Sequence, residues 1–228
     1  MPDPAMLMGD FHMHTWYSRD CGTSPRALVR RAVSIGLTCI AVTDHNSIKG
    51  ALAAQRIAPP QLRVIVAEEV KTTHGEITGF FLTQEIPKGL SPLETCRRIK
   101  AQGGLISIPH PYDRVRRYVL DPVVLQDILP LVDIVEVFNA RTTFISDSDK
   151  ARAFAATHGL PAGAGSDAHC SWELGHVRVE MPPFDGPQAF KDSLRRAVLH
   201  TRRSSPLYHG VSTFTKWRKR LLPFTHMR

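Results

Sequence analysis

Short apolar segments alternate with amphipathic segments along most of the chain. Seven of the apolar segments, rich in β-branched residues, have the length and composition of buried strands. They cover residues 7–13, 38–44, 62–70, 75–82, 104–109, 132–138 and 160–165. Helical patterns fall between most of them, and this alternation is typical of a parallel sheet whose strands are joined by helices.

Three of the helices have clear start and stop signals. They are expected over Ser24–Gly36, Ser91–Gly104 and near Asp147–His158. Ser24 and Ser91 are favourable N-caps, each followed by a proline suited to the first helical turn, and glycine follows the last helical residue in each case. Glu94, three residues after Ser91, completes the pattern of a capping box.

About seven strands, without the GxGxxG fingerprint of a dinucleotide-binding sheet, favour a closed β/α barrel. The 228 residues, 43% of them hydrophobic, are enough for one well-buried core. We therefore expect a single barrel domain over residues 1–200, and a basic extension over residues 201–228 that packs on the barrel or trails from it.

Polar residues gather where the expected strands end. They are His12 and His14, Asp44 and His45, Glu68 and Glu69, His110, Glu136 and Asn139, and Asp167 and His169. Because all strand ends of a β/α barrel open on one face, these residues should converge there. Asp10, His12 and His14 also alternate along the first strand, so they share one side at a spacing suited to chelation.

Imidazole and carboxylate groups without matching thiolates suit zinc, manganese or iron. The candidates outnumber the ligands of one tetrahedral ion, so we expect two or three divalent ions. Glu69 could bridge two of these ions, while Asp10 and Asp44 could orient the imidazoles from behind.

The net charge of +8 is concentrated at the C-terminal end. Ten lysine or arginine residues and one acidic residue follow position 190, which leaves the rest of the chain near neutral. This segment could attract phosphate or nucleic acid, or it could simply be a solvated helix face and tail. Residues 212–224 should form an amphipathic helix packed through Phe214, Trp217, Leu221 and Leu222.

The sequence gives no sign of export or of a membrane span. Apolar runs stay short of the roughly 18 residues that a spanning helix needs, and the first ten residues lack the pattern of a signal peptide. The four cysteines, Cys21, Cys39, Cys96 and Cys170, are widely spaced and form no CxxC pair. We expect reduced thiols, a cytoplasmic location and no membrane partner, while the oligomeric state stays open.

Six motifs together resemble one known family. They are DFHMHTWYSRD, AVTDHNSIKGA, VIVAEEVKTTHGEITGFFL, ISIPHPYDR, VEVFNAR and GAGSDAHCSWELG, and they span roughly Leu7 to Gly175. In this order they are similar to the PHP family, named for its polymerase and histidinol phosphatase members. The resemblance implies a distorted (β/α)7 TIM-like barrel, a di- or trinuclear metal centre, and hydrolysis of phosphate esters by a metal-activated water.

The resemblance also implies a set of metal ligands. They are His12, His14, Asp20, His45, Glu69 as the bridging carboxylate, His110, Asp167 and His169. The chain departs from many relatives at Glu76, where they often carry a histidine ligand. Either Glu76 ligates an ion or one ion binds weakly, and His74 is a less favoured substitute. We assign no chemistry to His158, His176, His200, His209 and His226.

The expected substrate is a small phosphorylated metabolite or a nucleotide, because no large insertion separates the motifs. Further donors for its phosphate are expected from arginines after two strand ends and from one amide, namely Arg114, Arg116, Arg117, Arg141 and Asn139. These arginines could equally be solvated loop residues. We assign no general acid, although Asp44 and His74 are candidates.

Three other functions stay open. A nuclease acting on nucleic-acid ends is supported by the basic C-terminal segment, and salt-dependent oligonucleotide binding would distinguish it. An amidohydrolase-like deaminase or lactonase also begins with HxH, but the SDAH and TDHN motifs favour the PHP family. The third is a metal-binding accessory domain that is catalytically weak, for which the departure at Glu76 is the only support.

Overall fold

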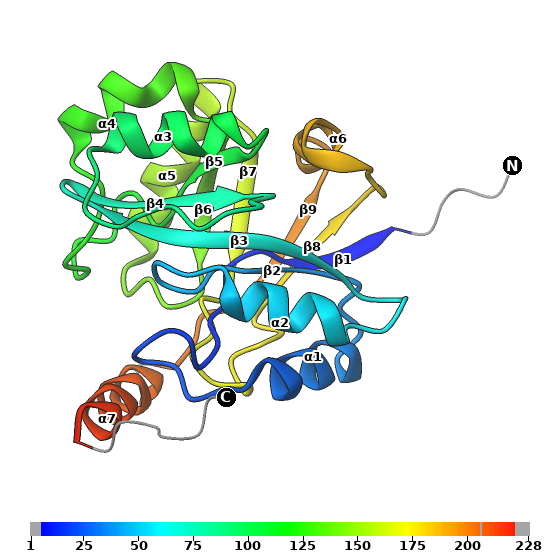
Figure 1. The fold of residues 1–228 in the computed structure, drawn as a ribbon. Coiled ribbons are helices and arrows are strands. Elements are labelled where there is room, and N and C mark those ends of the chain that lie inside the picture. Colours follow the sequence, from blue (N-terminus) through cyan, green and yellow to red (C-terminus); the bar gives the residue numbers. More distant parts are fainter. Residues whose placement is uncertain (1–5, 206, 222–228) are drawn as a thin grey trace, which may run out of the picture.

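One strongly curved sheet organises the computed structural model, which describes residues 6–205 and 207–221 (Figure 1). Its strands are hydrogen-bonded in the order β7-β6-β5-β4-β3-β2-β1-β8-β9. The strands are β1 (Leu7–Asp10), β2 (Cys39–Val42), β3 (Arg63–Thr72), β4 (Gly75–Phe80), β5 (Leu105–Ile108), β6 (Ile134–Asn139), β7 (Ala162–Gly165), β8 (Val177–Met181) and β9 (Val198–Thr201). All seven predicted strands are confirmed, and β8 and β9 are additional.

The sheet is nearly closed into a barrel by the segments that follow β1 and β7. The backbone N–H of Asp167 donates to the carbonyl of His12 at 2.7 Å, and that of His14 donates to the carbonyl of Ala168 at 2.9 Å. Met13 and Ala168 form an isolated parallel bridge at the same place. The predicted α/β barrel of the TIM-like type is therefore confirmed, and its seam runs between residues far apart in the sequence.

The alternation of strands and helices predicts a parallel sheet, but the observed sheet is only partly parallel. Strand β4 pairs antiparallel with both β3 and β5. The reason is local, because only Thr73 and His74 separate β3 from β4, and two residues can form a hairpin but not a helical crossover. This is the distortion from a regular β/α barrel.

Most of the helices cover the outside of the sheet, while one near the C-terminal end packs against the inner apolar cluster. The helices are α1 (Pro25–Ser34), α2 (Lys49–Ile57), α3 (Pro92–Ala101), α4 (Pro122–Ile128), the 3-10 helix Leu129–Leu131, α5 (Ile145–Thr157), α6 (Gly186–Leu194) and α7 (Leu207–Leu221). The N-caps of α1 and α3 are as predicted, since Ser24 accepts from the N–H of Ala27 and Ser91 from that of Glu94. The reciprocal half of the capping box is replaced by an ion pair between Glu94 and Arg98.

Alternation along β3 explains how the fold aims functional side chains. Ile65 and Ala67 belong to the apolar cluster inside the barrel, whereas Val64 and Val66 pack in the cluster beneath the outer helices. Glu69 continues the inner row, because side chains two residues apart share a face. Phe190 of α6 fills one end of the interior, with its ring centroid 5.0 Å from that of Phe11.

Small residues in β7 leave room for the site. A Cβ atom on Gly165 would lie 2.1 Å from the Cβ of His12 and 2.9 Å from Oε1 of Glu136. Any larger residue would displace these two side chains, so glycine at position 165 has a direct steric reason.

The C-terminal helix α7 forms as predicted but packs through the opposite face. Phe214, Trp217 and Leu221 were expected to be covered, yet each is more than half exposed. Ser212 is buried instead, and Lys219 points inward to backbone carbonyls. The prediction of an inward apolar face is therefore wrong, because polar partners for the other face come from distant loops. Leu222 lies outside the described residues.

The structure bears on two further expectations. The four cysteines are free thiols, as the sequence predicts. None of the helices in the described part of the chain combines the length and apolar character that a bilayer span requires.

Candidate metal centre

The predicted metal ligands gather at the barrel mouth, above the inner row of apolar side chains. His12, His14 and Asp20 follow β1, His45 follows β2, Glu69 and Glu76 lie on β3 and β4, His110 follows β5, and Asp167 and His169 follow β7. All but His45 and Asp20 are buried. Segments separated by more than 150 residues thus meet at one site, as the barrel prediction requires.

Glu69 lies at the centre of the cluster. Its Oε1 is 3.0 Å from Nε2 of His110. Its other oxygen, Oε2, is 3.0 Å from Nδ1 of His45 and 3.5 Å from Nε2 of His12. The two carboxylate oxygens therefore face different imidazoles, which is the arrangement that a carboxylate shared between two ions requires. Burial opposes its ionisation, but His12 and His45 hold the pKa of Glu69 well below its usual value.

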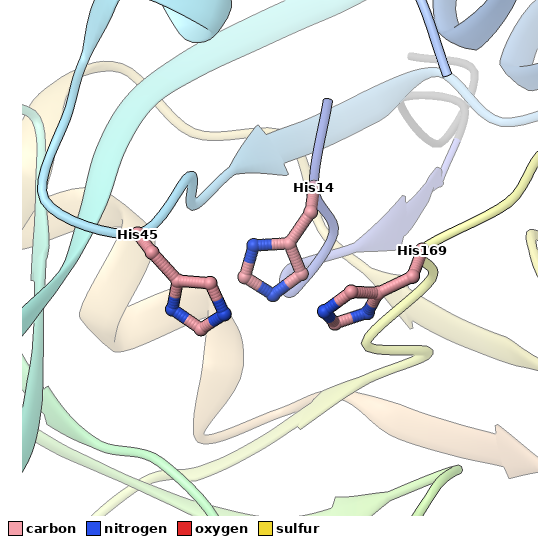
Figure 2. Close-up of side chains that lie close together, drawn as sticks. All are labelled: His14, His45 and His169. Atoms are coloured by element: carbon pink, nitrogen blue, oxygen red, sulfur yellow. The ribbon is translucent and has the colours of Figure 1, made fainter. Parts of the chain in front are cut away.

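Three overlapping groups of side chains offer ligand atoms within 4.8 Å of one another. They are His12, His14 and Asp167; His45, Glu69 and Glu76; and His14, His45 and His169. Figure 2 shows the last group, with three rings from three different loops directed at one space. Asp20 joins this group, since its Oδ1 lies 3.4 Å from Nε2 of His169 and its Oδ2 lies 3.7 Å from Nε2 of His45.

The protonation of the imidazoles differs across the site. Burial, together with His169 and His45, lowers the pKa of His14 to about 3, so its ring is neutral and able to ligate. Burial alone would also lower the pKa of His45, but Glu69 and Asp20 raise it to about 10. A divalent ion would therefore have to displace a proton from His45.

Glu76, rather than His74, lies in the cluster. The carboxylate of Glu76 is 3.9 Å from Nδ1 of His45 and 4.0 Å from Nε2 of His110. Burial and the nearby Glu69 raise its pKa to about 7. The ring of His74 instead contacts the hydroxyl of Thr73 at 2.8 Å in the exposed hairpin turn.

Asp167 connects the cluster to two of the predicted substrate-binding residues. Its Oδ1 lies 3.0 Å from Nε2 of His14, while its Oδ2 accepts hydrogen bonds from Arg116 and from Asn139. Although burial opposes it, the Arg116 guanidinium holds the pKa of Asp167 well below its usual value. Arg116 and Asn139 thus reach the cluster through a candidate ligand, and their contact with a substrate stays a prediction.

Glu136 orients two candidate ligands at once. Its Oε1 is 2.9 Å from Nδ1 of His12, and its Oε2 accepts the backbone N–H of His110 at 2.8 Å and the amide N–H of Asn139 at 3.1 Å. Nε2 of His12 is thereby left facing the other ligand atoms. A carboxylate behind a metal-binding imidazole fixes its tautomer and raises its basicity. The sequence placed Glu136 at a strand end but gave it no role.

Replacing Glu136 with glutamine is expected to weaken metal binding by about 10- to 100-fold. The amide of glutamine has one oxygen and one N–H group in place of the two carboxylate oxygens. It therefore cannot accept from His110 and Asn139 with one atom and from His12 with the other. Calorimetric titration of metal-free protein measures the effect. Glu180→Gln is the matched control, because Glu180 is partly exposed on β8, where it pairs with His200 at 2.9 Å rather than with a candidate ligand. Equal affinities in the two variants would contradict this role.

Asp44 acts behind the cluster, as predicted, but through hydroxyl groups. It accepts from the hydroxyls of Thr15 at 2.5 Å and Ser18 at 2.6 Å. Ser18 in turn lies 3.2 Å from Nδ1 of His14. Asp10 supports the barrel seam instead, because it accepts the N–H of Ser166 at 2.9 Å, and burial raises its pKa to about 7.

The other three predicted phosphate-binding arginines differ from one another in their surroundings. Arg114 pairs with Asp147 at 2.6 Å, and Arg117 is exposed. Arg141 is buried and its donors are used by Glu173, by Ser212 and by a contact to His169. Arg141 therefore joins the segments that carry Glu173 and Ser212, partners that could not be recognised from the sequence, and its contact with a substrate stays a prediction.

The unassigned histidines lie elsewhere. His176 contacts Ser204, His200 pairs with Glu180, and His158 packs on Phe154 after α5. The side chain of His209, and His226, lie outside the described part of the chain.

Family models match two parts of the chain. The model described as PHP domain matches residues 10–119, and the model described as PHP-associated matches residues 146–199. The first contains seven of the nine candidate ligands, and the second contains the remaining two, Asp167 and His169. The second match also covers β8 and α6, two of the elements for which the sequence made no prediction.

The chain is also similar to curated proteins and to solved structures. Over 145 residues, the chain is 39% identical to an uncharacterised protein of Methanocaldococcus jannaschii, covering 59% of this chain and 82% of that protein. A second one from the same organism is 33% identical over 196 residues, covering 82% and 78%. A two-domain protein of Bacteroides vulgatus, described as containing a predicted PHP-like metal-dependent phosphoesterase, has a TM-score of 0.69 at 19% identity, over 89% of this chain and 67% of that one. With its motifs, barrel and ligand cluster in agreement, the chain belongs to the PHP family.

Proposed function

We propose that this protein is a metal-dependent phosphoesterase that hydrolyses a phosphate ester of a small metabolite or nucleotide at a centre of two or three divalent ions. The observation that supports the proposal most directly is Glu69, whose two oxygens face His110 on one side and His45 and His12 on the other. The family match and the phosphoesterase description of a structural neighbour agree with it.

The residues present fit such a group of ions. Among the described residues, Nε2 of His12, Oε2 of Glu69 and Oδ1 of Asp20 are buried without a hydrogen-bond partner. Buried polar atoms without partners are costly unless something else satisfies them. Nitrogen and carboxylate ligands without thiolate suit manganese, zinc or iron.

Divalent ions held there would lower the pKa of a water molecule and offset the negative charge of a phosphoryl group. The protein's own residues then have separate tasks. Glu136 and Ser18 set the orientation of the His12 and His14 rings. Arg116 neutralises Asp167 and, at about one-fifth exposure of its side chain, is placed to meet a substrate phosphate as well. No side chain is assigned as the general acid.

Action on nucleic-acid ends is a second candidate, favoured by one feature of α7. Phe214 and Trp217 are exposed next to each other, with ring centroids 6.2 Å apart, on a helix whose last turn also carries the exposed Arg218 and Arg220. Exposed aromatic and basic side chains suit stacking on bases and contact with phosphates. Oligonucleotide binding that weakens steeply with salt would support this candidate.

A substrate screen with a matched variant tests the proposal. Metal-loaded protein is incubated with phosphomonoesters, nucleotide bisphosphates and 5′-phosphorylated oligonucleotides, and released phosphate or nucleotide is measured. We expect turnover with at least one class, and its loss in His12→Ala, which removes an imidazole from the cluster. Release that is the same in His12→Ala would reject this centre as its source. Metal binding without turnover on any class would instead favour the accessory-domain alternative.

A further inference from the structure

Helix α7 presents one polar face to the rest of the molecule. Tyr208, Ser212, Thr215 and Lys219 follow one another at spacings of three or four residues, which places them on one side of the helix. Ser212 is buried, and the other three are partly buried. The apolar side chains of α7 point the other way, so packing of hydrophobic surface does not explain how the helix is held.

Lys219 is bound by three backbone carbonyls of a single loop. Its Nζ donates to the carbonyl oxygens of Trp16, Ser18 and Cys21, each at 2.7 Å. An ammonium group has three N–H donors and no acceptor, so the three carbonyls use its whole hydrogen-bonding capacity. Such a fit is unusual for a lysine on a terminal helix, where the ammonium normally stays in water.

The loop that Lys219 binds carries a candidate metal ligand. Asp20 lies between Ser18 and Cys21, and its two oxygens approach the Nε2 atoms of His169 and His45 at 3.4 and 3.7 Å. Other contacts also hold parts of this loop, since the hydroxyl of Ser18 donates to Asp44 at 2.6 Å and the N–H of Trp16 donates to the carbonyl of Thr23 at 2.8 Å. The N–H of Ser18 donates to Thr15 at 2.9 Å, and that of Cys21 donates to Ser18 at a long 3.4 Å. Lys219 differs from them in joining carbonyls on both sides of Asp20.

The N-terminal half of α7 is linked through Arg141 to His169, a histidine that Asp20 approaches. Nη2 of Arg141 donates to the carbonyl of Tyr208 at 2.8 Å and to the hydroxyl of Ser212 at 2.6 Å. Nη1 of Arg141 lies 2.9 Å from Nδ1 of His169. The helix therefore spans two loops, with His169 at one end and Asp20 at the other.

We propose that Lys219 is a positioning residue that holds Asp20 in place to complete an ion site formed by Asp20, His45 and His169. This inference rests on the metal centre of the proposed function. Without the ammonium, three carbonyl oxygens directed at one point repel one another, and the loop that carries Asp20 loses its common anchor. The ion held by Asp20 should then bind more weakly, whereas ions held by His12, Glu69 and Asp167 should be unaffected.

Manganese binding by Lys219→Ala tests this role, with the signal of free manganese followed by electron paramagnetic resonance. Lys216→Ala is the matched control, because Lys216 lies on the same helix and is exposed. We expect Lys219→Ala to bind one ion per chain about 10- to 100-fold more weakly than the unaltered protein, with the remaining ion or ions unchanged. Lys216→Ala should bind manganese as the unaltered protein does.

Rescue by ammonium ions is a second test, because ammonium would not restore manganese binding if the substitution had only destabilised the helix. In Lys219→Ala the truncated side chain leaves space between the three carbonyls, and free ammonium carries the donors that are missing. Ammonium chloride should restore the weakened manganese site, whereas tetramethylammonium chloride at the same concentration should not. Unchanged manganese binding in Lys219→Ala, or weakened binding that ammonium fails to restore, would overturn the proposal.

Hydrogen exchange separates this inference from the proposed function. In metal-free protein, the amides of residues 16–21 should exchange faster in Lys219→Ala than in Lys216→Ala, and ammonium should slow them again. If the unaltered protein binds no divalent ion, the proposed centre fails by itself. Exchange of this loop at equal rates in both variants would overturn the role of Lys219, whether or not ions bind.

Discussion

Replacing Glu69 with glutamine is expected to lower kcat/KM for phosphoester hydrolysis by about 1,000-fold or more. Loss of the charge-stabilising ions removes several kcal/mol of transition-state stabilisation, and about 4 kcal/mol corresponds to this factor. Glutamine keeps the shape of Glu69 but offers one oxygen instead of two and carries no charge. It therefore cannot present a negatively charged oxygen both to the side of His45 and to the side of His110, as the carboxylate does. Steady-state kinetics and metal content measure the effect.

The neighbouring Glu68 provides the control. It lies on the outer face of β3, where it accepts the N–H of Ile86 at 2.8 Å, and burial raises its pKa to about 8. Its carboxyl group is therefore mostly neutral at pH 7, and Glu68→Gln should leave both activity and metal content close to those of the unaltered protein. If the two variants lose activity equally, or Glu69→Gln keeps its metal and its turnover, the central role of Glu69 is refuted.

Replacing Arg141 with methionine is expected to lower the free energy of unfolding by about 3–5 kcal/mol. Nε of Arg141 pairs with Glu173 at 3.0 Å, and both side chains are at least 95% buried. Removing one member of a buried pair leaves the other charge without compensation, which is the costly case. The substitution also releases Tyr208 and Ser212 of α7. Urea denaturation of the metal-free proteins measures the change.

An exposed pair calibrates this measurement. Arg98 contacts Glu94 one turn away on α3 at 2.8 Å, and nearly half of each side chain is exposed. Solvated pairs of this kind contribute less than about 1 kcal/mol, so Arg98→Met should be close to neutral. A loss in Arg141→Met no larger than that in Arg98→Met would show that Arg141 does not hold this region together.

Periodicity and strand-end positions were enough to predict much of the site. Alternation in β3 placed Glu69 on the same face as Ile65 and Ala67, and the barrel geometry then brought it near His12 and His110, although 40 or more residues separate them. Local patterns determine which way a side chain points. The barrel architecture then determines which side chains from distant strands meet at its mouth.

Features that depend on distant polar partners could not be predicted in this way. The sequence shows that α7 is amphipathic, but either its apolar or its polar face could pack against the molecule. The polar face with Lys219 turns inward because the Trp16–Cys21 loop supplies carbonyl partners for it. Arg141 looked like a rim arginine because Glu173 and Ser212, which bury it, lie more than 30 residues away. Strands β8 and β9 were missed because neither is a continuous buried apolar run: Arg178 and Glu180 interrupt β8, and three of the four residues of β9 are exposed.

The barrel seam has a consequence for the order of folding. The hydrogen bonds that join residues 12 and 14 to residues 167 and 168 close a loop of more than 150 residues, which is among the entropically most expensive contacts in the chain. Residues on both sides of the seam are candidate ligands, so assembly of the site and closure of the barrel are one event. A nascent chain that ends before β7 has neither, and ions that bind across the seam would slow its reopening more than any local contact could.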